Sequence, residues 1–136
     1  MAIRGVIETC LYVADVARAA TFYRDVLGFR LLSVDDRMAS LSVAERQLLL
    51  LFRTGGTTRP IATTGGVIPP HDGSGRLHVG FSIDHADVQT WRDRLAAANV
   101  AIESEVTWPR GGVSLYFRDP DENLVELLTP GVWEIY

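Results

Sequence analysis

The sequence contains no lysine and only one cysteine, Cys10. Without lysine, the chain has no residue for Schiff-base chemistry and no lysine general base. A single cysteine excludes an internal disulfide and a zinc site built from several thiolates, which favours a reducing compartment such as the cytoplasm. We expect no signal peptide, because Arg4 and Glu8 interrupt the only early apolar run, and no apolar run approaches the roughly 18 residues of a membrane span. We therefore expect a soluble, cytoplasmic protein without a membrane partner.

Positive charge is also sparse. The 13 basic residues are all arginines spread along the chain without a basic run, and the net charge is −4. This pattern lacks the basic stripe that binds a phosphate backbone, so nucleic acid is not an expected partner. With 136 residues and 47% hydrophobic content, residues 1–136 are long and apolar enough to form a single domain with its own core.

The first half of the sequence predicts one strand, one helix and three further strands. Residues 7–13 are rich in strand formers, and apolar residues at three- and four-residue steps predict a helix over 16–27. Asp15 is suited to the N-cap of this helix and Gly28 to its C′ position. Short strands are then predicted over 29–34, 38–43 and 47–52.

The second half repeats this order. A strand over 77–83 is followed by a helix that begins near Asp84, with Asp87 completing a capping box, and ends at Asn99. The buried stripe of this helix is predicted to contain Val88, Trp91, Leu95 and Ala98, and the strands after it cover 101–106, 112–117 and 124–129. Because the order and spacing of elements agree between the halves, we infer an internal duplication and an α+β fold of two βαβββ modules.

The segment 54–76 between the modules differs in composition, because more than half of it is Gly, Pro or Thr. A loop of this length inside a compact domain is usually a linker or a lid over a site. The predicted organisation is module 1 over 4–53, this loop, module 2 over 77–130 and a tail over 131–136. If the loop is a lid, His71 within it is a candidate proton shuttle.

Glu126 needs an explanation, since it lies in a predicted strand between Leu124 and Leu128 on the same face. A buried carboxylate costs several kcal/mol unless a cation or strong donors meet it. Glu126 therefore faces solvent, pairs with an arginine or binds a metal. In the repeat it is equivalent to Leu50, while Glu8 is equivalent to His78.

Four segments together carry a family resemblance: Glu8–Asp15, Phe22–Phe29, Leu77–Ile83 and Tyr116–Glu126. They are similar to the pattern of the vicinal oxygen chelate superfamily, which includes glyoxalase I, bleomycin resistance proteins, fosfomycin resistance enzymes and extradiol dioxygenases. The resemblance covers nearly the whole chain outside the central loop. It implies that the two modules form a curved mixed sheet about a pseudo-twofold axis, with helices on the outer face.

The resemblance also implies one divalent metal ion, Fe, Mn, Ni or Zn, held by Glu8, His78 and Glu126. Glu8 stands where many members have His or Gln, which makes the ligand set more anionic. Leu50 stands where glyoxalase I supplies a further glutamate. This substitution leaves an open position for substrate oxygens, as in the three-ligand sites of related enzymes.

Further candidate residues share faces or loops with these ligands. We expect catalytic roles for Tyr116 and Glu126, and substrate contacts from Cys10, Tyr12, Leu50, Trp108, Arg110, Ser114 and Tyr116. Cys10 is more simply explained as a small buried thiol. Trp108 and Arg110 either line a pocket, where they would contact a ring and an anion, or belong to a surface turn.

The leading interpretation is a metal-dependent enzyme that chelates two neighbouring oxygens of a small oxygen-rich or aromatic substrate. Its reaction is either dioxygenase chemistry or Lewis-acid lyase or isomerase chemistry. The missing carboxylate at Leu50 disfavours authentic glyoxalase I activity, and the absence of lysine disfavours a fosfomycin-type transferase. The alternative is a non-catalytic, drug-sequestering protein of the bleomycin-resistance type. The family resemblance further implies a homodimer.

Overall fold

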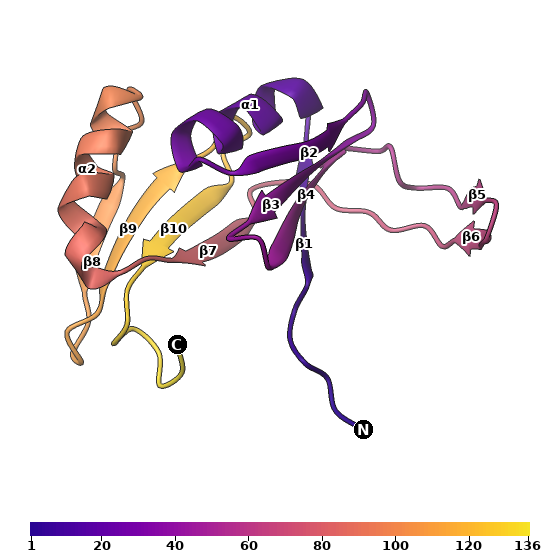
Figure 1. Ribbon diagram of the computed structural model, residues 1–136. Helices are drawn as coiled ribbons and strands as arrows, with labels where there is room; N and C mark the ends of the chain where they lie inside the picture. The colour runs from indigo at the N-terminus through magenta and orange to yellow at the C-terminus, as the bar shows by residue number, and fades with distance from the viewer. The chain divides into compact units, whose positions relative to one another are not determined.

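The computed structural model describes residues 1–136 and divides into two compact units, Met1–Gly75 and Arg76–Tyr136. Each unit contains a strand, a helix and three further strands that form a four-stranded mixed sheet (Figure 1). This confirms the predicted α+β fold of two βαβββ modules. Neither helix is long and apolar enough to cross a lipid bilayer.

The elements of unit 1 are β1 (Glu8–Val13), α1 (Val16–Leu27), β2 (Arg30–Val34), β3 (Met38–Val43), β4 (Gln47–Arg53), β5 (Ile61–Thr63) and β6 (Gly66–Ile68). Those of unit 2 are β7 (His78–Ser82), the 3-10 turn η1 (His85–Asp87), α2 (Val88–Ala97), β8 (Ser104–Thr107), β9 (Val113–Arg118) and β10 (Leu124–Leu128).

Helix α1 begins and ends where the sequence predicts. The Asp15 carboxylate accepts a hydrogen bond from the Arg18 N–H at 2.9 Å, which satisfies one free donor of the first turn. Gly28 ends the helix in the left-handed region at φ 77°, and its N–H donates to the Arg24 carbonyl. The buried face of α1, including Ala19 and Tyr23, packs against the sheet and forms the core of unit 1.

The two sheets follow one topology. In unit 1 the order is β1-β4-β3-β2, and in unit 2 it is β7-β10-β9-β8. The first and last strands of each module pair in parallel, and the other pairs are antiparallel. Since side chains alternate across a sheet, one face of each sheet carries the buried apolar residues toward the helix and the other carries the candidate site residues.

The start of α2 differs from the prediction. Asp84 makes no side-chain capping bond, and the chain instead forms the turn η1, closed by the Asp87 N–H and the Asp84 carbonyl at 3.0 Å. The capping box is therefore absent, because the backbone already satisfies this donor. Asn99 follows the end of the helix with φ 56°, as expected for a C′ residue. Ala98 is exposed rather than buried.

The central segment is more ordered than a loop. Strands β5 and β6 form a hairpin that extends from the sheet of unit 1 (Figure 1), with Ile61 opposite Ile68. Thr64 and Gly65 form its two-residue turn. The sequence did not predict this hairpin, since strands of three residues are too short to show alternation.

Candidate functional site

The candidate site of unit 2 lies on the sheet face opposite α2. The register pairs Glu126 of β10 with Gly80 of β7 on one side and with Tyr116 of β9 on the other. His78 lies two residues before Gly80 on β7 and is therefore on the same face. We call this surface the unit 2 face and define it by His78, Gly80, Ser114, Tyr116 and Glu126. The structure thus brings together the unit 2 residues that alternation had placed on one side.

The tautomer of His78 follows from its hydrogen bonds. Its Nδ1 lies 3.0 Å from the carbonyl oxygen of Leu124, and a carbonyl can only accept, so Nδ1 carries the hydrogen. Its Nε2 lies 3.3 Å from Oε2 of Glu126. In a neutral imidazole of this tautomer Nε2 is an acceptor, and a carboxylate oxygen is also an acceptor. Two acceptors at this distance repel each other unless a cation, either a proton or a metal ion, lies between them.

Glu126 is only 7% exposed, although it is ionisable. A buried carboxylate is costly without donors, and Tyr116 supplies one through its hydroxyl. Burial raises the pKa of the Tyr116 hydroxyl, the Glu126 hydrogen bond and charge add to this, and the Ser114 hydrogen bond opposes it. Tyr116 therefore remains protonated at neutral pH and acts as a donor to Glu126.

A chain of hydrogen bonds with one direction leads to this carboxylate. The indole Nε1–H of Trp108 can only donate, and it donates to Oγ of Ser114 at 2.9 Å. The Ser114 hydroxyl donates in turn to Tyr116, which donates to Glu126. Ser114 is fully buried, so water does not compete with Trp108 and Tyr116 for its hydroxyl. Trp108, predicted as a substrate contact, therefore also orients the group next to the site.

Gly80 leaves space beside the carboxylate. A Cβ at this position would lie 3.7 Å from Oε2 of Glu126 and 3.1 Å from Cδ2 of Leu128. Any larger side chain would extend over the oxygen that faces His78. The unit 2 face therefore combines a nitrogen donor and an oxygen donor, with no side chain at Gly80 to cover the oxygen, which fits the first requirements of an open metal site.

The candidate residues of unit 1 lie on the sheet face opposite α1. Cys10 of β1 pairs with Leu50 of β4, and Glu8 and Tyr12 lie on the same side of β1. Cys10 is exposed, so its interpretation as a buried thiol is wrong. Partial burial of the sulfur and the nearby Glu8 carboxylate raise the pKa of the thiol, which keeps it protonated at neutral pH.

Tyr12 forms a cluster with the end of the central segment. Its hydroxyl lies 2.6 Å from Nδ1 of His71, and the His71 ring packs edge-on against Phe52 with centroids 4.7 Å apart. Thr57 holds His71 by two bonds, since its hydroxyl donates to the His71 carbonyl and its own carbonyl accepts from the His71 N–H. The sequence did not predict this contact. The only signal for it was a single histidine in a loop rich in Gly and Pro.

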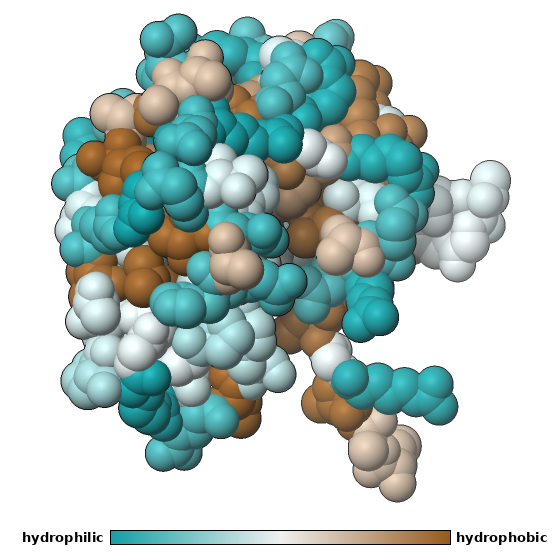
Figure 2. Space-filling model, turned by 60° about the vertical axis from the view of Figure 1, so that its left-hand side comes forward, coloured by the Kyte–Doolittle hydropathy of each residue, from teal (hydrophilic) through white to brown (hydrophobic).

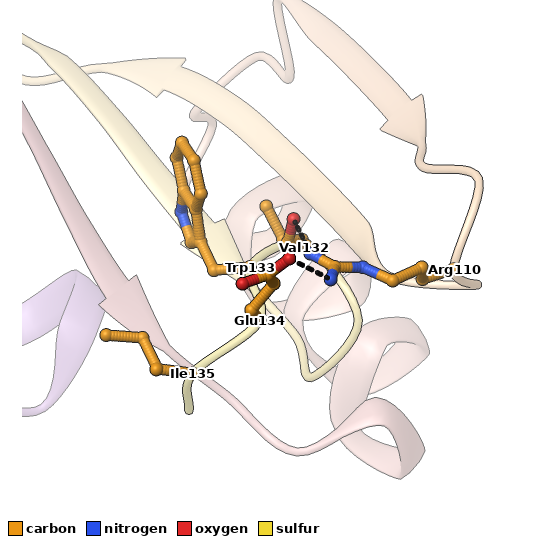
Figure 3. A pocket seen from close by; sticks show the side chains of 5 residues that line it. All are labelled: Arg110, Val132, Trp133, Glu134 and Ile135. Carbon is orange, nitrogen blue, oxygen red and sulfur yellow. Dashed lines mark hydrogen bonds and ion pairs between the residues drawn. The ribbon is translucent and has the colours of Figure 1, made fainter.

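Arg110 lies in the loop between β8 and β9 and contacts the C-terminal segment. It borders a separate cavity of about 790 Å³ next to the C-terminal segment, lined also by Val132, Trp133, Glu134 and Ile135 (Figure 3). Its guanidinium donates to the Val132 carbonyl at 3.2 Å and lies 3.9 Å from a Glu134 oxygen. Both of its contacts are within the protein, so Arg110 holds the C-terminal segment in this structure.

The predicted ligand set is divided between the units. His78 and Glu126 form a pair in unit 2, and Glu8 belongs to unit 1. Within neither unit do three or more His, Cys, Asp or Glu side chains come together as a metal cluster. The structure therefore shows only two of the predicted ligands, His78 and Glu126, close together. The complete ligand set of Glu8, His78 and Glu126 stays a prediction.

Comparison with known proteins shows the class. Residues 5–127 match the family model of the Glyoxalase/Bleomycin resistance protein/Dioxygenase superfamily. The chain belongs to this superfamily, which confirms the resemblance found in the sequence.

Particular relatives support the same assignment. The fold is similar to the crystal structure of a lactoylglutathione lyase from Agrobacterium tumefaciens, with 34% identity, a TM-score of 0.88 and 98% of each chain covered. A metallothiol transferase, FosB, from Staphylococcus epidermidis is 29% identical over 95% of this chain and 84% of its own length. The fosfomycin resistance protein FosX from Listeria monocytogenes shares the fold at 19% identity and a TM-score of 0.70, over 96% of this chain and 97% of its own. The first two relatives are enzymes by name, which supports the expectation of an enzyme.

Proposed function

We propose that the protein is an enzyme that binds one divalent metal ion through His78 and Glu126, with Glu8 as the third ligand. The observation that carries this proposal is the 3.3 Å approach of Nε2 of His78 to Oε2 of Glu126, with Nδ1 already donating to a backbone carbonyl. Histidine ligands of metals commonly donate their second ring N–H in this way. The same geometry leaves Nε2 free to bind a cation.

The proposed substrate is a small oxygen-rich or aromatic molecule. A bound metal ion would supply a Lewis acid for two neighbouring substrate oxygens or, as Fe(II), a site for dioxygen. The similarity to a lactoylglutathione lyase favours the Lewis-acid lyase or isomerase class over dioxygenase chemistry. Leu50 supports a reaction different from that of glyoxalase I, since this face of unit 1 carries no carboxylate at β4.

The residues of the unit 2 face have separable roles. The donor chain from Trp108 ends on Glu126 and orients this carboxylate. Tyr116 holds its proton at neutral pH and can lend it to developing negative charge when Glu126 shifts. The exposed thiol of Cys10 and the aromatic ring of Tyr12 would contact substrate from unit 1.

Metal analysis tests the proposal. Protein purified without chelators should contain one divalent ion per chain, and His78→Ala and Glu126→Ala should each lower this content to background. Glu8→Gln should weaken binding less, because it keeps the pair intact. His85→Ala is the matched control, since His85 is also an exposed histidine but lies at η1. Metal-free wild-type protein that binds aromatic drugs tightly would instead support the drug-sequestering alternative.

We further propose that the protein is a cytoplasmic homodimer. The single cysteine suits a reducing compartment, and apolar surface is visible among the polar residues in Figure 2. Large exposed apolar side chains include Ile3, Val6, Ile7, Val67, Ile68, Trp133 and Ile135. Apolar residues of this size on the surface are typical of subunit contacts. Light scattering at micromolar concentration should give twice the chain mass, and a monomer would refute this part of the proposal.

A further inference from the structure

The turn between β9 and β10 contains two polar side chains that are almost completely buried. Asp119 is 3% exposed and Asn123 is 0% exposed. One oxygen of Asp119 accepts hydrogen bonds from the N–H groups of Asp121 and Asn123, and its other oxygen accepts from the Asn123 side-chain amide, all at 2.9 Å. Buried polar groups with this many bonds form a rigid network.

The network reaches the residue before His78. The side-chain oxygen of Asn123 accepts from the N–H of Leu77 at 2.9 Å, and the N–H of Leu124 donates to the Leu77 carbonyl at 2.8 Å. The carbonyl of Leu124 then accepts from Nδ1 of His78. Asn123 at the end of the turn and Leu124 at the start of β10 therefore fix both the backbone at Leu77 and the imidazole of His78.

Unit 1 shows that the strand pairing alone does not need such a network. The bond from the Leu48 N–H to the Ile7 carbonyl, at 2.7 Å, is the counterpart of the bond between Leu124 and Leu77. The turn before β4 contains Ala44 and Glu45 in the left-handed region and provides no side-chain bond to the start of β1. The parallel pair β1–β4 nevertheless forms over six residue pairs. The additional bonds of unit 2 thus require another explanation.

We propose that Asp119 and Asn123 are positioning residues that hold His78 with Nδ1 protonated and Nε2 directed at the metal position. This inference rests on the proposed metal function of the unit 2 face. The chemistry dictates the residue types, because only an amide at 123 can donate to Asp119 and also accept from Leu77. An aspartate there would place two carboxylates side by side, which is unfavourable in a buried position.

A charge swap tests the proposal. Asn123→Asp alone should disturb the network. In the double variant Asp119→Asn with Asn123→Asp, the bond between the two side chains can re-form with its donor and acceptor exchanged, while the side-chain oxygens at 119 and 123 still accept from the backbone N–H groups. In the metal-free protein, 15N NMR of the His78 ring should show one fixed tautomer in the wild type and in the double variant, and a mixture in the single variant. Co²⁺ affinity should fall by about 10- to 100-fold in the single variant and return to within about 3-fold of the wild type in the double variant.

Asp35→Asn is the matched control, because Asp35 also accepts backbone N–H bonds in a turn, but in unit 1. It should change neither the His78 tautomer nor Co²⁺ affinity. A folded Asn123→Asp variant with a wild-type tautomer and wild-type affinity would overturn the positioning role. If the Asn123→Asp variant does not fold, the double variant tests the positioning role instead. A folded double variant that binds Co²⁺ weakly and shows a mixture of His78 tautomers would also overturn this role. Failure of wild-type protein to bind Co²⁺ would refute the metal function, and the tautomer measurement would still test the positioning.

Discussion

The two units have the same fold but opposite chemistry on their open faces. In unit 2 the last strand presents Glu126, and its neighbours His78 and Tyr116 are polar and hydrogen-bonded to it or to the adjacent backbone. In unit 1 the equivalent strand presents Leu50, which is buried and apolar. Since the backbone plan is the same, the difference lies in side chains alone. The comparison shows that, on equivalent strands, unit 2 places an ionisable side chain where unit 1 places an apolar one.

Glu126→Leu would give unit 2 the residue that unit 1 has at the equivalent position, Leu50. Of the substitutions considered, we expect it to have the largest effect, which is on metal affinity. Metal affinity should fall at least about 100-fold, because one of two charged or basic donors in the unit is lost. The stability of the metal-free protein should not fall in parallel, since replacing a buried ionic group by an apolar one of similar volume is often neutral or stabilising. Isothermal titration with Co²⁺ and thermal unfolding with chelator measure the two effects. A large loss of metal-free stability would mean that Glu126 is primarily structural.

The reverse substitution, Leu50→Glu, should act on stability. Leu50 is 8% exposed and lies between Cys10 and Ser40 in the sheet, with no cation among these strand partners. A carboxylate there loses hydration without an ion partner, so we expect a loss of about 2 to 4 kcal/mol in the free energy of unfolding. Urea unfolding with chelator measures it, and Leu50→Met is the control because it conserves volume. An unchanged unfolding free energy would show that unit 1 tolerates the chemistry of unit 2.

The sequence predicted the parts of each unit that depend on local patterns. Asp15 and Gly28 are recognisable as helix ends because capping and the left-handed conformation favour a few residue types. Alternation placed Ser114 and Tyr116 on one face of their strand, and the register puts both on the same side as Glu126. These features depend on residues close together in the chain.

Contacts between distant residues could not be predicted in the same way. The bond between Tyr12 and His71 joins two residues whose separation no short pattern describes. From the sequence, Asn123 could be interpreted only as a residue that favours turns. Its hydrogen bond with Leu77 depends on the pairing of β7 with β10, which the sequence does not show. The order of donors from Trp108 to Glu126 likewise depends on one loop and the two strands β9 and β10 meeting. The site was therefore predictable in its residue types but not in its network.

The cluster of Tyr12 and His71 gives unit 1 a feature that unit 2 lacks, and Gly73 tests it. A Cβ at Gly73 would lie 2.4 Å from two ring atoms of Tyr12, too close for any real contact. Gly73→Ala should therefore displace the end of the central segment and destabilise the protein by about 1 to 3 kcal/mol. Gly65→Ala is the matched control, because a Cβ at Gly65 would meet no atom within 4 Å beyond its chain neighbours. Equal stability of both variants, measured by urea unfolding, would show that the segment is not held against Tyr12.

The smallest expected effect is on alkaline stability and concerns the hydroxyl of Tyr116. Its pKa is raised in the folded protein by burial and by Glu126, so the folded state retains this proton more tightly than the unfolded chain. The resulting stabilisation is complete below the unfolded pKa of about 10 and is lost as the pH rises through the higher folded pKa. Tyr116→Phe should remove this dependence, so that in the presence of chelator its unfolding free energy falls less steeply above about pH 10 than that of the wild type.

Tyr12→Phe is the comparison in unit 1. Burial is the main cause that raises the pKa of the Tyr12 phenol, and Cys10 and Asp72 add to it. The contrary result is that Tyr116→Phe leaves the fall of unfolding free energy with pH unchanged, while Tyr12→Phe makes this fall less steep. That result would show that the polar network of unit 2 does not hold the Tyr116 proton, and it would refute the hydrogen bond that Tyr116 is proposed to donate to Glu126.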